Sequence, residues 1–260
     1  MERGGDFLRK LWHRCLMRAP VRDFFRLIWY DAGMNLRERM KCAIFDMDGT
    51  LLDSMWMWAT QGVELIQRHG KIPAKNVWLD LKVLNSTETA QYLIENYGIE
   101  GSVEDVIQEI DDAANRHYST DLFLKPGARE LLVRLNELHI PAILATATDK
   151  RLVRTCLKRL DIERYFFRVN SCEDFHTAKS EPLIFQKSAE MAGVDVSHAV
   201  VFEDSLYAIR TAHNAGFPVV AVYDKSAEEV SMPPVSDWQR IIPLADITCA
   251  NPGQIVPLLA

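Results

Sequence analysis

Between residues 41 and 223 the sequence alternates short apolar segments with longer amphipathic ones. The apolar segments are rich in Val, Ile, Phe and Ala and show little polar alternation, which is typical of β-strands covered on both faces. Five such strands are predicted, over 41–46, 140–146, 165–170, 199–203 and 217–223. Apolar residues at helical spacing predict helices over 127–139, 148–160, 180–192 and 204–215. This alternation predicts an α/β fold in which helices cover both faces of a parallel sheet.

Residues 55–119 interrupt this alternation, because they contain only helical patterns. Helices are predicted over 55–69, 86–97 and 102–118, and the last begins with the capping box Ser102-x-x-Asp105. Because this segment lies between the first and second strands, we expect an inserted helical cap domain over 55–119. The α/β core then comprises 41–54 and 120–245, and a C-terminal tail over 246–260 receives no role.

Charge is unevenly distributed along the chain. Residues 1–40 carry nine Lys and Arg and five Asp and Glu. Residues 41–260 carry 21 Lys and Arg and 31 Asp and Glu, so this part of the chain is strongly acidic. Binding to nucleic acid requires clustered positive charge, which an acidic core does not offer. The longest apolar runs, such as 217–223, are far shorter than the ~20 residues that span a bilayer. We therefore expect neither a nucleic-acid partner nor integral membrane contact.

The five cysteines are an odd number, are widely spaced and form no Cys-x-x-Cys pair. No secretory signal is recognised at the start of the sequence. We therefore expect reduced thiols and a cytoplasmic location. For the oligomeric state the expectation is a monomer or a weak dimer.

Polar residues collect where the predicted strands end. The first strand runs into 46–48 (Asp-Met-Asp), the second into 146–148 (Thr-Ala-Thr) and the fourth into 203–205 (Glu-Asp-Ser). Ligands of open parallel sheets bind at the carboxyl ends of the strands, so these residues are expected to converge. An acidic cluster is costly unless a cation neutralises it, and oxygen ligands suit Mg²⁺. Taken singly, Asp204 and Thr148 have the alternative role of helix N-caps.

Four motifs in a fixed order resemble those of the haloacid dehalogenase-like (HAD) superfamily of phosphohydrolases. Residues 46–54 (Asp-Met-Asp-Gly-Thr-Leu-Leu-Asp-Ser) resemble the first motif, 143–146 the second and 201–205 the fourth. Lys179 and the residues that follow it resemble the third, with Ser180 in place of its first proline. The resemblance covers about residues 41–225 and implies a Rossmann-like core. It also implies that the insertion is the α-helical cap found in phosphoglycolate phosphatases and β-phosphoglucomutases.

The resemblance implies a Mg²⁺-dependent hydrolase that acts on a small phosphorylated metabolite through an aspartyl-phosphate. Asp46 would be the nucleophile, because covalent catalysis divides one difficult displacement into two easier ones. Asp48 would protonate the leaving oxygen and then activate the hydrolytic water.

The same resemblance assigns the ligands of the metal and of the phosphoryl group. The expected Mg²⁺ ligands are Asp46, Asp48 through its backbone carbonyl, and Asp204, with Glu203 acting indirectly or through water. The expected phosphoryl-binding residues are Thr146, Ala147 and Lys179.

Several alternatives stay open at this point. A phosphomutase of the same fold is disfavoured because its β-phosphoglucomutase branch has a histidine where Trp58 stands. Dehalogenation is disfavoured because that branch lacks the second aspartate, which Asp48 supplies here. Phosphonate hydrolysis would need a cap lysine, for which Lys71, Lys75 and Lys82 are the candidates without further support. A regulatory binding module would be expected to have lost a catalytic or metal-binding residue, and none is missing.

Some conspicuous residues receive a plainer interpretation. Trp56 and Trp58 at a helix start are more often core residues, with a place in the substrate pocket as the alternative. Lys150 and Arg151 are interpreted as surface residues. The seven histidines show no metal-ligand spacing, so none is assigned to catalysis.

Three interpretations of residues 1–40 compete. A basic amphipathic helix could contact a membrane surface or a partner peripherally. A mitochondrial-type presequence is disfavoured by the acidic residues in the segment. The third and favoured interpretation places the start of translation at Met34 or Met40, because residues 40–46 resemble the usual beginning of the family.

Overall fold

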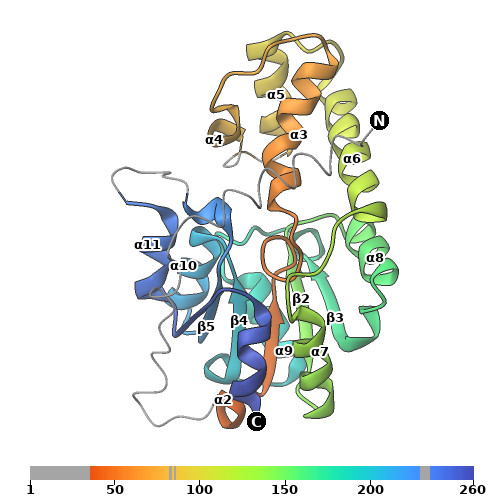
Figure 1. Cartoon of the computed structure of the whole chain (residues 1–260). Helices are drawn as coiled ribbons and strands as arrows, with labels where there is room; N and C mark the ends of the chain where they lie inside the picture. Colours follow the sequence, from red (N-terminus) through yellow and green to blue (C-terminus); the bar gives the residue numbers. More distant parts are fainter. Residues whose placement is uncertain (1–35, 82–83, 85, 229–234) are drawn as a thin grey trace. The chain divides into compact units, whose positions relative to one another are not determined.

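The computed structural model describes residues 36–81, 84, 86–228 and 235–260 (Figure 1). The described chain divides into two compact units. One comprises residues 36–53 and 123–260, and the other comprises residues 54–122.

The larger unit is built on a six-stranded sheet with the order β3-β2-β1-β4-β5-β6. All five neighbouring pairs are parallel, and Phe45 of β1 lies in register with Leu144 of β2 and Phe202 of β4. The residues that follow these three strands therefore emerge at one edge of the sheet. The strands are β1 (Cys42–Phe45), β2 (Ala142–Thr146), β3 (Phe166–Ser171), β4 (Ala199–Glu203), β5 (Val219–Val222) and β6 (Ile247–Cys249).

Helices cover both faces of this sheet, so the expected Rossmann-like α/β fold is confirmed. One apolar cluster joins alternate strand residues such as Ile44 and Val201 to buried side chains of α9, α10 and α11, including Phe185 and Ile209. Alternation along the strands explains this, because successive side chains point to opposite faces. The helices of the unit are α2 (Leu36–Arg39), α7 (Ala128–Glu137), α8 (Lys150–Arg159), α9 (Leu183–Ala192), α10 (Leu206–Asn214) and α11 (Asp237–Ile241).

The segment 246–260, expected as a tail without a role, belongs to this sheet. Its strand β6 pairs with β5, and the 3₁₀ segment η8 (Pro252–Leu259) packs against α7. Gly127, with a φ of +73°, permits this packing, because a Cβ there would lie 2.1 Å from the Cα of Gly253. A strand of only three residues carries too little periodicity to be recognised in the sequence.

The elements described in the smaller unit are all helices, joined by loops. Its apolar core is formed by residues such as Leu65, Leu93 and Val106, and the expected capping box of Ser102 and Asp105 is formed. Trp56 is buried and its ring contacts the ring of His117 edge-on, whereas Trp58 is partly exposed. The helices are α3 (Met55–Arg68), α4 (Val77–Leu81), α5 (Ser86–Tyr97) and α6 (Val103–Thr120).

The hypotheses about the N-terminal segment fall mainly outside the described residues, which begin at residue 36. In the described part of this segment, residues 36–40, the side chains of Leu36 and Met40 are buried, and α2 contacts η8. Among the described residues, no helix has the length and apolar character needed to cross a membrane. Lys82, one of the cap lysines considered above, is also outside the described residues.

Candidate active site

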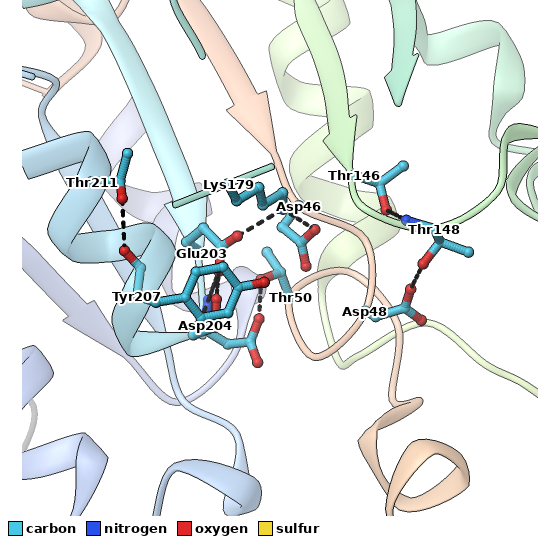
Figure 2. A network of polar contacts seen from close by, with 11 residues as sticks. Asp46, Asp48, Thr50, Thr146, Thr148, Lys179, Glu203, Asp204, Tyr207 and Thr211 are labelled. Carbon is cyan, nitrogen blue, oxygen red and sulfur yellow. Dashed lines mark hydrogen bonds and ion pairs between the residues drawn. The ribbon is translucent and has the colours of Figure 1, made fainter. Parts of the chain in front are cut away.

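The candidate site lies at the carboxyl edge of the sheet, where β1, β2 and β4 end (Figure 2). Asp46 directly follows β1, Thr146 is the last residue of β2, and Glu203 is the last residue of β4. All three side chains are buried. Parallel pairing in register therefore brings together residues that are separated by about 100 and 157 positions in the sequence.

Asp46, Glu203 and Asp204 form a compact acidic cluster. One carboxylate oxygen of each lies within 4.8 Å of the others, and the three residues are 8%, 1% and 4% exposed. Burial raises the pKa of Asp46 to about 7 even though the Lys179 ammonium lowers it, and burial and Glu203 raise the pKa of Asp204 well above its usual value. Without a cation, ionising every member of this cluster is therefore unfavourable.

Lys179 supplies the internal positive charge of the cluster. Its Nζ donates to Asp46 Oδ1 and lies 2.7 Å from Glu203 Oε1, and the residue is only 3% exposed. The two carboxylates raise the pKa of Lys179 despite the opposing effect of burial, so it stays protonated. Lys179 lies in the loop that precedes α9, and Pro182 occupies the N-cap position of that helix. This ion pair is inconsistent with a solvated surface lysine.

Glu203 is occupied by protein donors on both of its oxygens. Oε1 accepts from Lys179, and Oε2 accepts from the backbone N–H groups of Asp204 and Ser205 and from Ser205 Oγ, each at 2.9 Å. These contacts hold the carboxylate rigidly and leave it little capacity to bind a metal directly. Asp46 and Asp204 are the members whose oxygens are less engaged.

Asp204 is oriented by Thr50, whose Oγ1 donates to Asp204 Oδ1 at 3.0 Å. Both residues are buried, and Figure 2 shows Thr50 between Asp46 and Asp204. Thr50 belongs to the first motif, but nothing in the sequence pattern predicted that it would contact Asp204. The N-cap position of α10 is held by Ser205, so Asp204 is not the cap of that helix.

The carboxylate of Asp48 lies outside the acidic cluster. Its Oδ2 accepts a hydrogen bond from Thr148 Oγ1 at 2.7 Å, and the Thr148 N–H donates to Thr146 Oγ1 at 3.0 Å (Figure 2). The alternative role of Thr148 as a helix N-cap does not apply, because Asp149 caps α8 by accepting from the N–H groups of residues 151 and 152. Thr148 is thereby available to Asp48.

A second buried ion pair supports the same edge of the sheet. Lys125 Nζ lies 2.9 Å from Asp224 Oδ2 and donates to the Tyr223 carbonyl at 2.8 Å. The Lys125 N–H donates to the carbonyl of Leu51, in the loop that carries Thr50. Asp224 acts to raise and Lys125 to lower the pKa of Asp204, which indicates that the pair lies near the cluster. Nothing in the sequence pattern distinguishes Lys125 from an ordinary loop lysine.

The remaining expected residues lie close by or on the surface. Ala147 is exposed in the turn after β2, where its N–H and that of Thr148 follow Thr146. Lys150 forms a 2.7 Å ion pair with Asp174, and the Arg151 side chain is 85% exposed. Both therefore lie at the surface of the unit.

The chemistry of the cluster fits a divalent cation. Its donors are carboxylate oxygens, which are the ligands that hard cations prefer. Three carboxylates face one ammonium, so the ionised cluster carries an excess of negative charge that a divalent ion would compensate.

Comparison with known proteins shows the family of the chain. Residues 43–222 match the haloacid dehalogenase-like hydrolase family, so the chain belongs to that family. The phosphorylated carbohydrates phosphatase of Thermotoga maritima is 29% identical over 177 residues, which are 68% of this chain and 82% of that protein. The phosphoglycolate phosphatase of Pseudomonas savastanoi is 26% identical over 217 residues, which are 78% and 79% of the two chains.

Solved structures show the same likeness. A structure described as a "putative beta-phosphoglucomutase" from Thermotoga maritima has a TM-score of 0.70 at 26% identity, covering 85% of this chain and 98% of that one. CbbY from Rhodobacter sphaeroides, solved with phosphate, has a TM-score of 0.67 at 17% identity, covering 83% and 96%, and shows the shared fold alone. The expected family and enzyme class are confirmed: this is a HAD-type phosphatase.

Proposed function

We propose that this protein is a Mg²⁺-dependent phosphatase that moves the phosphoryl group of a small phosphorylated metabolite first to Asp46 and then to water. The observation that carries the proposal is the buried cluster in which Asp46 contacts Lys179 beside Glu203 and Asp204. Such a cluster combines a carboxylate nucleophile with a cation that attracts a phosphate.

Asp46, Asp204 and the backbone carbonyl of Asp48 would hold Mg²⁺. When bound, the ion would supply positive charge that screens the carboxylates from the anionic substrate. Glu203 would contribute by holding Lys179 and the N–H groups that follow β4, since its oxygens are already engaged. This division agrees with the indirect role expected of Glu203.

In the first step, Asp46 attacks phosphorus, forming a new O–P bond while the bond to the leaving oxygen breaks. Lys179, the Thr146 hydroxyl and the N–H of Ala147 would bind the non-bridging oxygens, whose negative charge they stabilise. Asp48 transfers its proton to the leaving oxygen, so that the product departs as an alcohol.

In the second step, Asp48 takes a proton from water, which attacks phosphorus and releases phosphate from Asp46. The hydrogen bond from Thr148 to Asp48 would hold the carboxylate in position for both transfers. The two aspartates thereby keep separate roles, which fits their separate hydrogen-bond partners.

The relatives support a carbohydrate or another small organic phosphate as substrate. One is named a phosphorylated carbohydrates phosphatase and another a phosphoglycolate phosphatase. We take a carbohydrate phosphate as the first candidate. The expected cytoplasmic location and the monomeric or weakly dimeric state stay predictions.

The alternative activity is a phosphomutase of the same fold. A specific observation favours it, because a structural relative at 26% identity is described as a "putative beta-phosphoglucomutase". The absence of a histidine at position 58 argues against it. The two activities differ in whether phosphate is released to solution or retained on the product.

The testing experiment measures phosphate release from carbohydrate phosphates, phosphoglycolate, nucleotides and acetyl phosphate, with Mg²⁺ and with EDTA. Wild-type protein is expected to release phosphate only with Mg²⁺, and Asp46→Asn to lose at least about a thousandfold in kcat. Lys150→Met is the matched control at the surface of the same unit and should retain activity. Isomerised sugar phosphate without phosphate release would establish the mutase instead, and unaltered activity of Asp46→Asn would overturn the mechanism.

A further inference from the structure

Tyr207 has no role in the chemistry described above, yet it lies beside it. The residue is the second of α10 and follows Asp204 by three positions. The next two residues, Ala208 and Ile209, are fully buried against the sheet, whereas Tyr207 is 51% exposed. It thus occupies the outward face of α10 in the turn nearest to the end of β4.

Helix geometry directs this side chain toward the site. Cα–Cβ bonds in an α-helix tilt toward the N-terminus, so a side chain in the first turn leans back over the residues that precede the helix. For α10 these residues are Glu203 and Asp204. Figure 2 shows the Tyr207 ring extending from α10 toward Thr50, drawn across these two carboxylates.

Electrostatics place the hydroxyl end within the field of the cluster. Burial raises the pKa of the Tyr207 hydroxyl, Glu203, Asp46 and Asp204 raise it further, and Lys179 lowers it. The phenol therefore stays protonated. Figure 2 shows the hydroxyl end directed toward Thr50, and the residue is 51% exposed, so part of the ring is open to solvent near the cluster.

We propose that Tyr207 is a specificity-determining residue whose ring packs against the organic part of the phosphorylated substrate; this inference rests on the proposed function. Aromatic rings pack well against the apolar faces of carbohydrates and similar groups, with the phenol end satisfied by polar neighbours. The Tyr207 ring would favour substrates whose carbon skeleton extends beyond the phosphoryl-binding residues. Acetyl phosphate is too small to use this contact fully.

Isolated exposed aromatic residues are common on protein surfaces and need no function. Phe167 of β3 is such a residue in the same unit, 51% exposed with the Arg168 guanidinium 5.2 Å from its ring centre. It stands on an edge strand whose end carries none of the cluster carboxylates. Phe167 is therefore a matched control of equal exposure.

The experiment compares kcat/KM for the best carbohydrate phosphate of the panel, with glucose 6-phosphate as its first member, and for acetyl phosphate. Tyr207→Leu is expected to lower the ratio of the two values about tenfold, mainly through KM of the carbohydrate phosphate. Tyr207→Phe keeps the ring and is expected to change the ratio by no more than about threefold. Phe167→Leu should leave the ratio unchanged.

Each other outcome has a distinct meaning. Equal losses on both substrates, or an unchanged ratio in Tyr207→Leu, would overturn the role of Tyr207 while the phosphatase stands. A loss in Tyr207→Phe as large as in Tyr207→Leu would overturn the ring contact. Turnover of acetyl phosphate without any carbohydrate phosphate would overturn the substrate class, and no phosphate release by wild type would overturn the proposed function itself.

Discussion

Thr148 Oγ1 lies 2.7 Å from Asp48 Oδ2 and donates a hydrogen bond to it across two loops of the sheet edge. The same threonine donates its N–H to Thr146 Oγ1. The turn after β2 is therefore tied both to the first motif and to the end of its own strand. This relationship separates Asp48 from the cluster that surrounds Asp46.

Replacement of Thr148 tests whether this bond positions Asp48. Thr148→Val keeps the size of the side chain but removes the donor, so kcat is expected to fall about fivefold to tenfold while KM changes little. Steady-state kinetics with saturating Mg²⁺ measure the effect. Thr148→Ser retains the hydroxyl and should keep most of kcat, so equal losses in the two variants would contradict the positioning role.

The raised pKa of Asp46 predicts that Mg²⁺ binding depends on pH. Burial raises this pKa to about 7 in the metal-free protein, and metal binding requires the ionised carboxylate. The apparent affinity for Mg²⁺ should therefore rise with pH, by up to about tenfold per unit below pH 7, and then level off. Calorimetry in two buffers of different ionisation enthalpy should detect about one more proton released at pH 6 by wild type than by Asp46→Asn.

The same shift predicts how the stability of the metal-free protein changes with pH. Between about pH 4 and pH 7 the folded protein holds a proton on Asp46 that the unfolded chain has lost, so this group's contribution to the free energy of unfolding falls as pH rises. In EDTA the melting temperature of wild type should decline over this range relative to Asp46→Asn. A parallel course of the two proteins would contradict the raised pKa.

The Lys125–Asp224 pair should be costly to break on one side. Both side chains are less than 10% exposed, so Lys125→Met leaves a buried carboxylate without its cationic partner and should cost about 3–5 kcal/mol in the free energy of unfolding. Urea denaturation measures this. The double variant Lys125→Met/Asp224→Leu should be more stable than Lys125→Met alone, because it removes the stranded charge.

An exposed ion pair provides the control for that prediction. Lys187 and Glu190 lie 2.7 Å apart on α9 with side chains 41% and 68% exposed, so Lys187→Met should cost less than about 1 kcal/mol. If Lys125→Met and Lys187→Met lowered the free energy of unfolding equally, the predicted cost of leaving a buried charge unpaired would be contradicted.

Two glycines of similar backbone conformation should respond differently to alanine. Gly127 and Gly193 have φ values of +73° and +66°, but only at Gly127 would a Cβ meet another chain segment, at Gly253. Gly193→Ala should cost about 1–2 kcal/mol from the left-handed conformation alone. Gly127→Ala adds the steric clash and should cost at least about 1 kcal/mol more, as measured by the difference in urea unfolding.

Local patterns were sufficient to predict most elements of the fold. The strand predicted over 199–203 has the bounds of β4, because residues 199–202 are a continuous apolar run that ends at the charged residues Glu203 and Asp204. The helix over 86–97 likewise agrees with α5. The short elements α4 and β6 were not predicted, since three to five residues carry too little periodicity to be distinguished from loops.

The sequence by itself determined which residues stand at the ends of buried strands, and hence that Asp46, Thr146 and Glu203 would meet at one edge of a parallel sheet. In each of the three strands, the local sequence alone marks where the apolar run ends and the polar residue begins. The apolar pattern also favours the register that brings these three ends together. Only the tertiary structure decided which polar groups pair across that edge. Thr148 with Asp48, Thr50 with Asp204 and Lys125 with Asp224 are partners whose contacts depend on how separate loops pack, and no spacing along the chain encodes that packing.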